Sequence, residues 1–100
     1  MKPVVVDDEA GDEVEEAIDF LNSRWPGLGN DFRVEVERAL DLIGRQPKAF
    51  SLGRDGYRKY VITRFGYVLI FFEFDAYVWV TAVYHGSRNP DYWRHRQPPQ

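Results

Sequence analysis

Apolar residues in the first half of the chain recur with the spacing of helical faces. The first set, spaced i, i+3, i+4, i+7 and i+11, comprises Val14, Ala17, Ile18, Leu21 and Trp25. The second set comprises Phe32, Val36, Ala39, Leu40 and Ile43. Pro26 and Gly27 stop the first pattern, and an aspartate at position 7, 8 or 12 can cap its beginning. The sequence therefore predicts an antiparallel hairpin of two helices.

The hydrophobic pattern changes after the polar residues 51–56. Residues 57–64, 67–74 and 77–85 are rich in β-branched and aromatic side chains, as strands are. Only two residues separate each pair of runs, which predicts tight hairpins. A short β-branched run at residues 3–6 predicts one more strand. The predicted fold class is α+β, with a short N-terminal strand, the helix hairpin and then a three-stranded antiparallel meander.

Two-residue loops would also fix the register of the meander. Arg58 would then face Glu73 across the strands, and His85 would lie beside Gly66. Four side chains would gather at one end of the sheet: Arg64, Tyr67, Tyr84 and His85.

The meander has two apolar faces, but the helix hairpin can cover only one of them. The face expected beneath the helices carries Tyr60, Ile62, Leu69, Phe71, Val78, Val80 and Ala82. The opposite face carries Val61, Ile70, Phe72, Phe74, Trp79 and Val83. Either the C-terminal segment with Tyr92 and Trp93 or another chain must shield this second face.

Length and composition predict one domain at residues 1–96, with residues 97–100 as a frayed tail. The absence of cysteine excludes disulfides and thiolate metal sites. The N-terminus is too short and acidic for a signal peptide, and no apolar run approaches the roughly 18 residues of a membrane helix. We therefore expect a soluble, cytoplasmic protein without membrane contact.

The net charge of −3 conceals two halves of opposite sign. Residues 1–44 hold 4 basic and 12 acidic side chains, a net of −8, whereas residues 45–100 hold 9 basic and 4 acidic ones, a net of +5. The C-terminal half could meet an anionic partner. The alternative is that both halves simply present solvated charges.

Three segments of the chain resemble the ParE/RelE toxins of bacterial type II toxin–antitoxin pairs. Residues 29–32 and the helix after them are similar to the second helix of that family. Residues 56–59 and 64–67 are similar to its arginine-bearing second strand and the following turn. Residues 82–93 (AVYHGSRNPDYW), followed by Arg96, resemble the terminal strand and tail common among ParE-like and plasmid-stabilisation proteins. The resemblance spans residues 12–96.

The resemblance implies a growth-inhibiting toxin that a cognate antitoxin neutralises in a hetero-oligomer. ParE-like members poison DNA gyrase, whereas RelE-like members cut messenger RNA in the ribosome without a metal. The RNase branch tends to be strongly basic, and this chain is acidic overall, so it gains little non-specific attraction to RNA. A ParE-like toxin is therefore the favoured interpretation, and a RelE-like endoribonuclease is the alternative. Neither requires a cofactor or a metal.

If the chain is an RNase, the candidate catalytic residues are His85, Arg64, Arg88 and Tyr92. His85 titrates in the range suited to proton transfer, and the two arginines could hold a phosphate. Tyr92, or Tyr84, could stack on a base or donate a proton. The plain alternative is that His85 caps the strand end or bonds a loop carbonyl.

The expected partner-binding residues are Arg58, Ile70, Phe72, Trp79 and Trp93. An antitoxin segment would bury Trp79 on the uncovered sheet face, and it should be acidic to match the basic half. Structural alternatives exist for two of these residues. Arg58 could pair with Glu73, and Trp93 could pin the tail by packing with Tyr92.

Overall fold

The computed structural model describes residues 1–99. The elements, in chain order, are β1 (Val4–Val6), α1 (Asp8–Arg24), α2 (Leu28–Arg45), a 3-10 turn η1 (Pro47–Ala49), β2 (Arg58–Ile62), β3 (Tyr67–Glu73) and β4 (Val78–His85). Asp7 caps α1, because its carboxylate accepts a hydrogen bond from the Glu9 amide at 3.0 Å. The predicted order of elements and the helix hairpin are confirmed.

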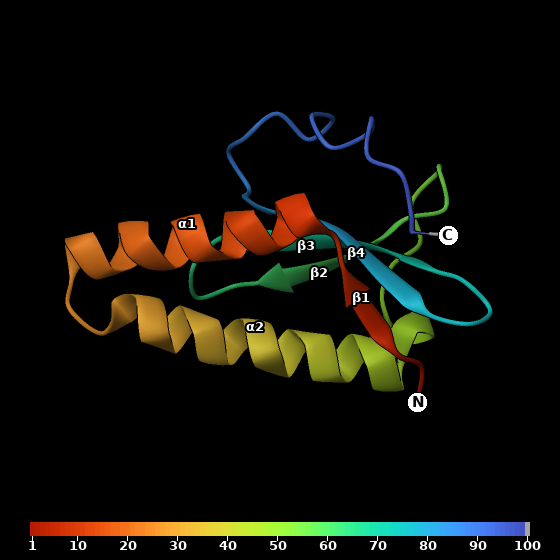
Figure 1. Ribbon diagram of the computed structural model, residues 1–100, viewed down its shortest axis with the longest axis horizontal. Helices are drawn as coiled ribbons and strands as arrows, with labels where there is room; N and C mark the ends of the chain where they lie inside the picture. Colours follow the sequence, from red (N-terminus) through yellow and green to blue (C-terminus); the bar gives the residue numbers. More distant parts are fainter. Residues whose placement is uncertain (100) are drawn as a thin grey trace.

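The two helices lie side by side in front of the sheet and spread apart toward β1 (Figure 1). At their closed end, the Gly29 amide donates to the Asn22 side chain at 2.7 Å. A Cβ at Gly29 would lie 2.3 Å from the Ile18 carbonyl oxygen, so only glycine allows this approach. At the open end, β1 crosses between the beginning of α1 and the end of α2.

The sheet has four strands in the order β1-β4-β3-β2. Strands β2, β3 and β4 form the predicted antiparallel meander. Strand β1, however, joins the edge of β4 in parallel, with Val4 opposite Val78. The prediction of a purely antiparallel sheet is therefore wrong, because the N-terminal strand makes it mixed.

The predicted register is wrong at the first hairpin, where Ile62 faces Tyr67 and residues 63–66 form a four-residue loop, so Arg58 faces Phe71. At the second hairpin the predicted tight turn is confirmed, since the Phe74 amide donates to the Tyr77 carbonyl at 2.8 Å and Glu73 faces Val78. Farther from that turn the pairing of β3 and β4 shifts by one residue between Ile70 and Phe71, so Tyr67 faces His85.

Arg58 does not pair with Glu73 in this register. Its guanidinium donates to the Phe50 carbonyl at 2.7 Å. The Glu73 carboxylate instead accepts from Lys2 at 2.9 Å and Lys48 at 2.8 Å. These bonds, with that from Lys48 the stronger cause, lower the pKa of Glu73.

A bulge in β4 changes which side chains share a face. Ile70 faces Ala82 whereas Phe71 faces Val80, so Thr81 is an extra residue on β4. Beyond the bulge the alternation is inverted. Ala82 therefore packs on the second face and Val83 on the helix face, the reverse of the prediction for these two residues.

The C-terminal segment, residues 87–99, covers much of the second face. Trp93 is 3% exposed and packs with Ile70 and Ala82 in a small second core, whose border includes Phe72. Trp79 stacks on Phe72 and is also only 3% exposed. Covering by the C-terminal segment, one of the two alternatives, is confirmed. The prediction of an open face where an antitoxin buries Trp79 is wrong.

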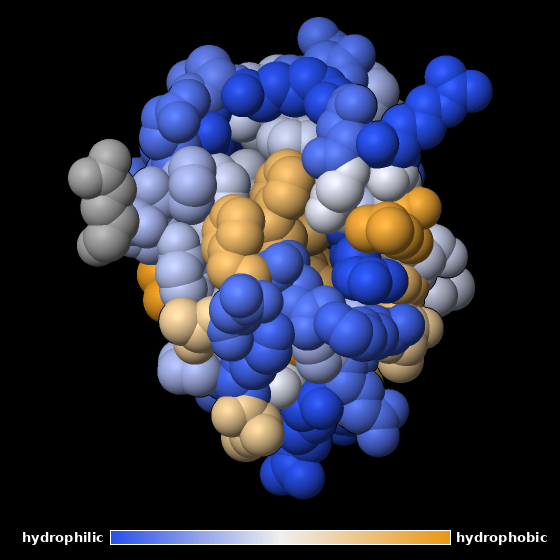
Figure 2. All heavy atoms as spheres, turned by 90° about the vertical axis from the view of Figure 1, so that its right-hand side faces the viewer, coloured by the Kyte–Doolittle hydropathy of each residue, from blue (hydrophilic) through white to orange (hydrophobic). Residues whose placement is uncertain are grey.

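The beginning of the chain and the last described residues lie toward the same end of the molecule, on the right of Figure 1. The Tyr77 hydroxyl donates to the Pro99 carbonyl at 2.8 Å, while Gln100, the end of the expected frayed tail, lies outside the described residues. Hydrophilic side chains dominate this end, and its apolar side chains form small islands (Figure 2). Within residues 1–99, no helix is both long and apolar enough to cross a membrane.

Candidate functional site

A cleft of about 250 Å³ lies between α1 and the end of β4. Helix α1 contributes Glu13, Glu16, Ala17 and Phe20, β3 contributes Tyr67, β4 contributes Val83, Tyr84 and His85, and the following turn contributes Arg88. The cleft therefore contains two carboxylates, one guanidinium, an imidazole and three aromatic rings.

The His85 ring is held from three sides. Its Nδ1 accepts a hydrogen bond from the Ser87 amide at 3.2 Å and lies 2.8 Å from the Ser87 hydroxyl. Its edge packs against Tyr67 with ring centroids 5.4 Å apart, and its Nε2 lies against Gly66. Because Nδ1 accepts from an amide, the neutral ring carries its hydrogen on Nε2. The His85 side chain remains exposed to solvent.

The Arg88 guanidinium already interacts with two side chains of the protein, Tyr92 and Glu13. Its guanidinium carbon lies 3.7 Å from the centroid of the Tyr92 ring. Its Nη1 lies 3.8 Å from the Glu13 carboxylate. A phosphate at this position would have to compete with Glu13.

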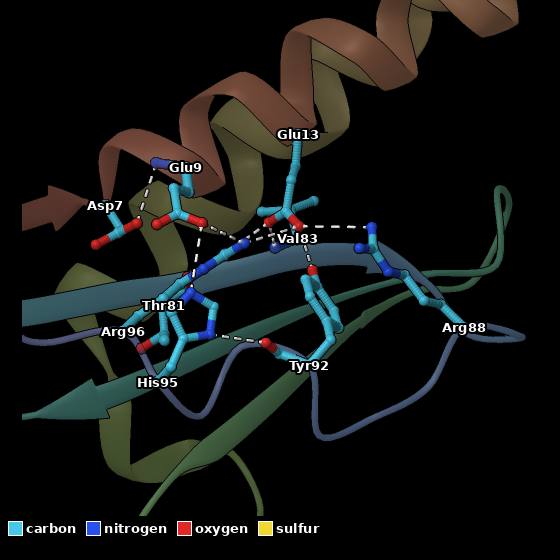
Figure 3. Close-up of polar contacts among 9 residues, drawn as sticks. All are labelled: Asp7, Glu9, Glu13, Thr81, Val83, Arg88, Tyr92, His95 and Arg96. Carbon is cyan, nitrogen blue, oxygen red and sulfur yellow. Dashed lines mark hydrogen bonds and ion pairs between the residues drawn. The ribbon is translucent and has the colours of Figure 1, made fainter.

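Glu13 is the centre of a largely buried polar cluster (Figure 3). Its side chain is 11% exposed and accepts hydrogen bonds from the Val83 amide at 3.0 Å and from Arg96 at 2.9 Å. The Tyr92 hydroxyl also donates to this carboxylate. Arg96 is 5% exposed and donates to the Thr81 carbonyl at 2.8 Å, while its other nitrogen lies 3.2 Å from Glu9.

The cluster replaces a strand partner for β4. Strand β1 ends at Val6, and its last contact with β4 is the bond from the Asp7 amide to the Val80 carbonyl at 2.9 Å. Beyond that point, the Arg96 side chain bonds the Thr81 carbonyl and Glu13 bonds the Val83 amide. Buried backbone groups must find partners, so these two side chains complete the edge of β4.

Three phenols near the cleft hold their protons more firmly than a free tyrosine does. Burial raises the pKa of Tyr67, and burial is also the main cause of the raised pKa of Tyr84. The pKa of Tyr92 is raised strongly, first by burial and then by its hydrogen bond to Glu13. All three hydroxyls therefore remain protonated at neutral pH and act only as hydrogen-bond donors or acceptors.

The four predicted catalytic residues do not converge on one point. His85 and Arg88 line the cleft, and Tyr92 lies beneath Arg88 and is bonded to Glu13. Arg64 is not part of the lining, since it pairs with Asp31 on α2 at 3.1 Å and lies over the Phe65 ring. Of the predicted group at this end of the sheet, the structure brings together Tyr67, Tyr84 and His85.

Sequence reasoning did not identify Glu13, and it noted Arg96 only as part of the tail. One signal was available for Glu13. It lies three residues after Ala10 and four before Ala17, which places a carboxylate on the apolar face of α1. No comparable local pattern marks Arg96, because its partners lie on α1 and β4, far away in the sequence.

The expected partner-binding residues are mostly inaccessible. Ile70, Trp79 and Trp93 are buried, Phe72 is half-buried, and Arg58 is bonded to Phe50. Within the described residues, 1–99, no group of three or more histidines and carboxylates is placed to hold a metal ion. Comparison with protein-family models and with curated proteins gives no match for this chain.

Proposed function

We propose that the protein is a ParE-like toxin of a toxin–antitoxin pair, which acts by binding a protein target, with DNA gyrase as the expected one. The resemblance of three segments to that family motivates the proposal. The order of strand, two helices and three strands is the one that the resemblance implies. Fold alone does not establish function, so the choice between binding and catalysis depends on the site.

The composition of the cleft is the observation that favours binding. RNA cleavage by the 2′-hydroxyl needs cationic groups near the phosphate. Here Glu13 and Glu16 line the cleft, Glu13 is the nearest anion to Arg88, and Arg64 is paired elsewhere. A phosphate would therefore meet two carboxylates in the cleft and only one arginine.

A second candidate function is metal-independent cleavage of messenger RNA, as in RelE-like toxins. The observation that favours it is the exposed imidazole of His85, whose Nδ1 is fixed as an acceptor, in the same cleft as Arg88. Tyr67, which is half-buried, adds an aromatic ring on which a base could stack.

The antitoxin would bind where the sheet remains open. The C-terminal segment leaves Val61 on β2 54% exposed, and Leu52 beside that strand is 61% exposed. We call Leu52, Lys59 and Val61 the β2 surface. Arg54 and Arg64 flank it along the chain, so an acidic segment with apolar anchors would complement it.

Induced expression of the chain, alone and with the adjacent open reading frame, tests the proposal. We expect growth arrest that the neighbouring protein relieves, inhibition of gyrase in supercoiling assays, and intact messenger RNA. The variant His85→Ala should retain growth arrest, as should the control His95→Ala, which alters an exposed histidine outside the cleft.

Shortened transcripts and loss of arrest in His85→Ala alone would instead establish the RNase function. A chain that arrests growth in neither condition would refute the toxin proposal altogether.

A further inference from the structure

A second hollow lies where α1 and α2 spread apart, on the side of the hairpin near β1. Its volume is about 190 Å³. The apolar lining comprises Val6, Val14, Val36, Leu40, Val80 and Val83, and the remaining lining residues are Gly11, Glu15, Arg33 and Glu37. An apolar cavity of about 150 Å³ holds a benzene-sized molecule, so this crevice has room for a phenyl side chain.

Gly11 lies beside the crevice in the second turn of α1. A Cβ at this position would meet no atom within 4 Å, so close packing does not require glycine here. Within a helix, glycine is less stable than alanine by about 1 kcal/mol. The residue therefore destabilises α1 while keeping the side of the crevice free of a side chain.

The polar residues around the crevice carry a net negative charge. Glu15 binds Arg33 through two hydrogen bonds of 3.0 and 3.3 Å, which leaves Glu37 as the excess charge. The surrounding hairpin has the same sign, since residues 8–45 hold 11 acidic and 4 basic side chains, a net of −7. Such a surface attracts a basic partner and repels an acidic one.

From these three observations, we infer that the crevice is a docking site for a basic segment of a partner protein. The segment inserts one bulky apolar side chain between α1 and α2, and its lysine or arginine pairs with Glu37. The site is separate from the β2 surface, which would accept an acidic segment. It also stands independently of the proposed toxin function.

Methyl NMR of the full chain, titrated with three capped tripeptides, tests this inference. The probes are N-acetyl-Lys-Phe-Lys-amide, N-acetyl-Glu-Phe-Glu-amide and N-acetyl-Lys-Ser-Lys-amide. We expect saturable shifts of the Val14, Val36 and Val80 methyl groups with Lys-Phe-Lys at millimolar concentration. The other two peptides should bind at least about tenfold more weakly, because each lacks either the charge match or the buried ring.

Two variants separate filling of the crevice from a change in helix stability. Gly11→Leu places a side chain beside the crevice and should weaken Lys-Phe-Lys binding about tenfold or more. Gly11→Ala also replaces the helix-destabilising glycine, but its single methyl group does not fill the crevice. This variant should therefore bind Lys-Phe-Lys like the wild type. Should Gly11→Leu fail to fold, Glu37→Gln provides the second measurement, with an expected loss of about two- to fivefold.

Three results would overturn the inference. One is the absence of saturable shifts in the wild type, and another is equal binding by the alanine and leucine variants. The third is Glu-Phe-Glu binding as tightly as Lys-Phe-Lys, which would show that the crevice does not select a basic segment.

Discussion

At the scale of single residues, Arg96 connects the C-terminal segment to both α1 and β4. Replacing it with methionine keeps much of the apolar stem but leaves the Thr81 carbonyl without its donor and removes a partner of Glu13. Orphaned buried groups of this kind cost about 1–3 kcal/mol each, so urea unfolding should show a loss of at least that size.

Arg38 provides the matched control, because its pair with Glu35 at 2.9 Å lies on the exposed face of α2. Exposed pairs contribute about 0.2–1 kcal/mol, so Arg38→Met should have little effect. Equal losses in the two variants would contradict a special role for Arg96.

Tyr92 is a second residue whose environment predicts a measurable effect. Burial and the bond to Glu13 raise its pKa above that of a free tyrosine, about 10. Above pH 10 the unfolded chain releases a proton that the folded chain retains. Stability that is fully present below pH 10 is therefore lost as pH rises.

The variant Tyr92→Phe should weaken this alkaline loss, by up to about 1.4 kcal/mol per pH unit. A residual slope should remain, since the pKa values of Tyr67 and Tyr84 are also raised. The measurement is the free energy of unfolding, by urea, at several pH values above 9. Parallel curves for the variant and the wild type would show that Tyr92 ionises alike in both states.

At the scale of elements, the hairpin depends on the close approach of its helices at Gly29. An alanine Cβ there would lie 2.3 Å from the Ile18 carbonyl oxygen, a backbone atom that cannot rotate away. The helices would have to separate, and overpacking of this kind costs about 1–3 kcal/mol.

We therefore expect Gly29→Ala to lower the melting temperature. Gly11→Ala, in open space on the partner helix, should raise it, because alanine favours a helix. A stabilising Gly29→Ala would mean that the helices do not approach this closely.

The elements themselves were predictable, whereas the pairing of the strands was predictable only near the turn between β3 and β4. The helical spacing from Val14 to Leu21 and the β-branched run of β4 each carry a local signal. The loop length of the first hairpin carries no such signal, since Phe65 and Gly66 are the last two residues of a four-residue loop rather than a complete two-residue turn. The bulge at Thr81 also has no signal in the sequence. Alternation of apolar and polar residues cannot show where two residues of one strand lie opposite a single residue of its neighbour.

For the candidate site, too, only the features with a local signal in the sequence were predictable. His85, Tyr67 and Tyr84 were expected together because they belong to strand ends, and the altered register still brings them to the same end of the sheet. The roles of Glu13 and Arg96 depend on contacts that span more than 80 residues, which no local pattern encodes.

At the scale of the whole molecule, the acidic and the basic half of the chain lie on different surfaces. The acidic hairpin lies on one face of the sheet, while the β2 surface lies at the opposite edge from β1. If an acidic antitoxin segment binds the β2 surface, long-range attraction should speed its approach, and apolar contacts should determine how slowly it leaves.

Raising the salt concentration should therefore slow association markedly and change dissociation little, because charges are screened beyond about 8 Å at physiological salt. Lys59→Glu should reduce the association rate, whereas Val61→Ser should mainly speed dissociation. Arg38→Glu, on the hairpin, serves as the control of equal charge change, and it should leave both rates nearly unchanged. These rates can be measured by stopped-flow with the purified neighbouring protein. Two outcomes would show that the charged surfaces are solvated faces without a role in recognition. One is an association rate that does not change with salt concentration, and the other is an equal effect of Lys59→Glu and Arg38→Glu on that rate.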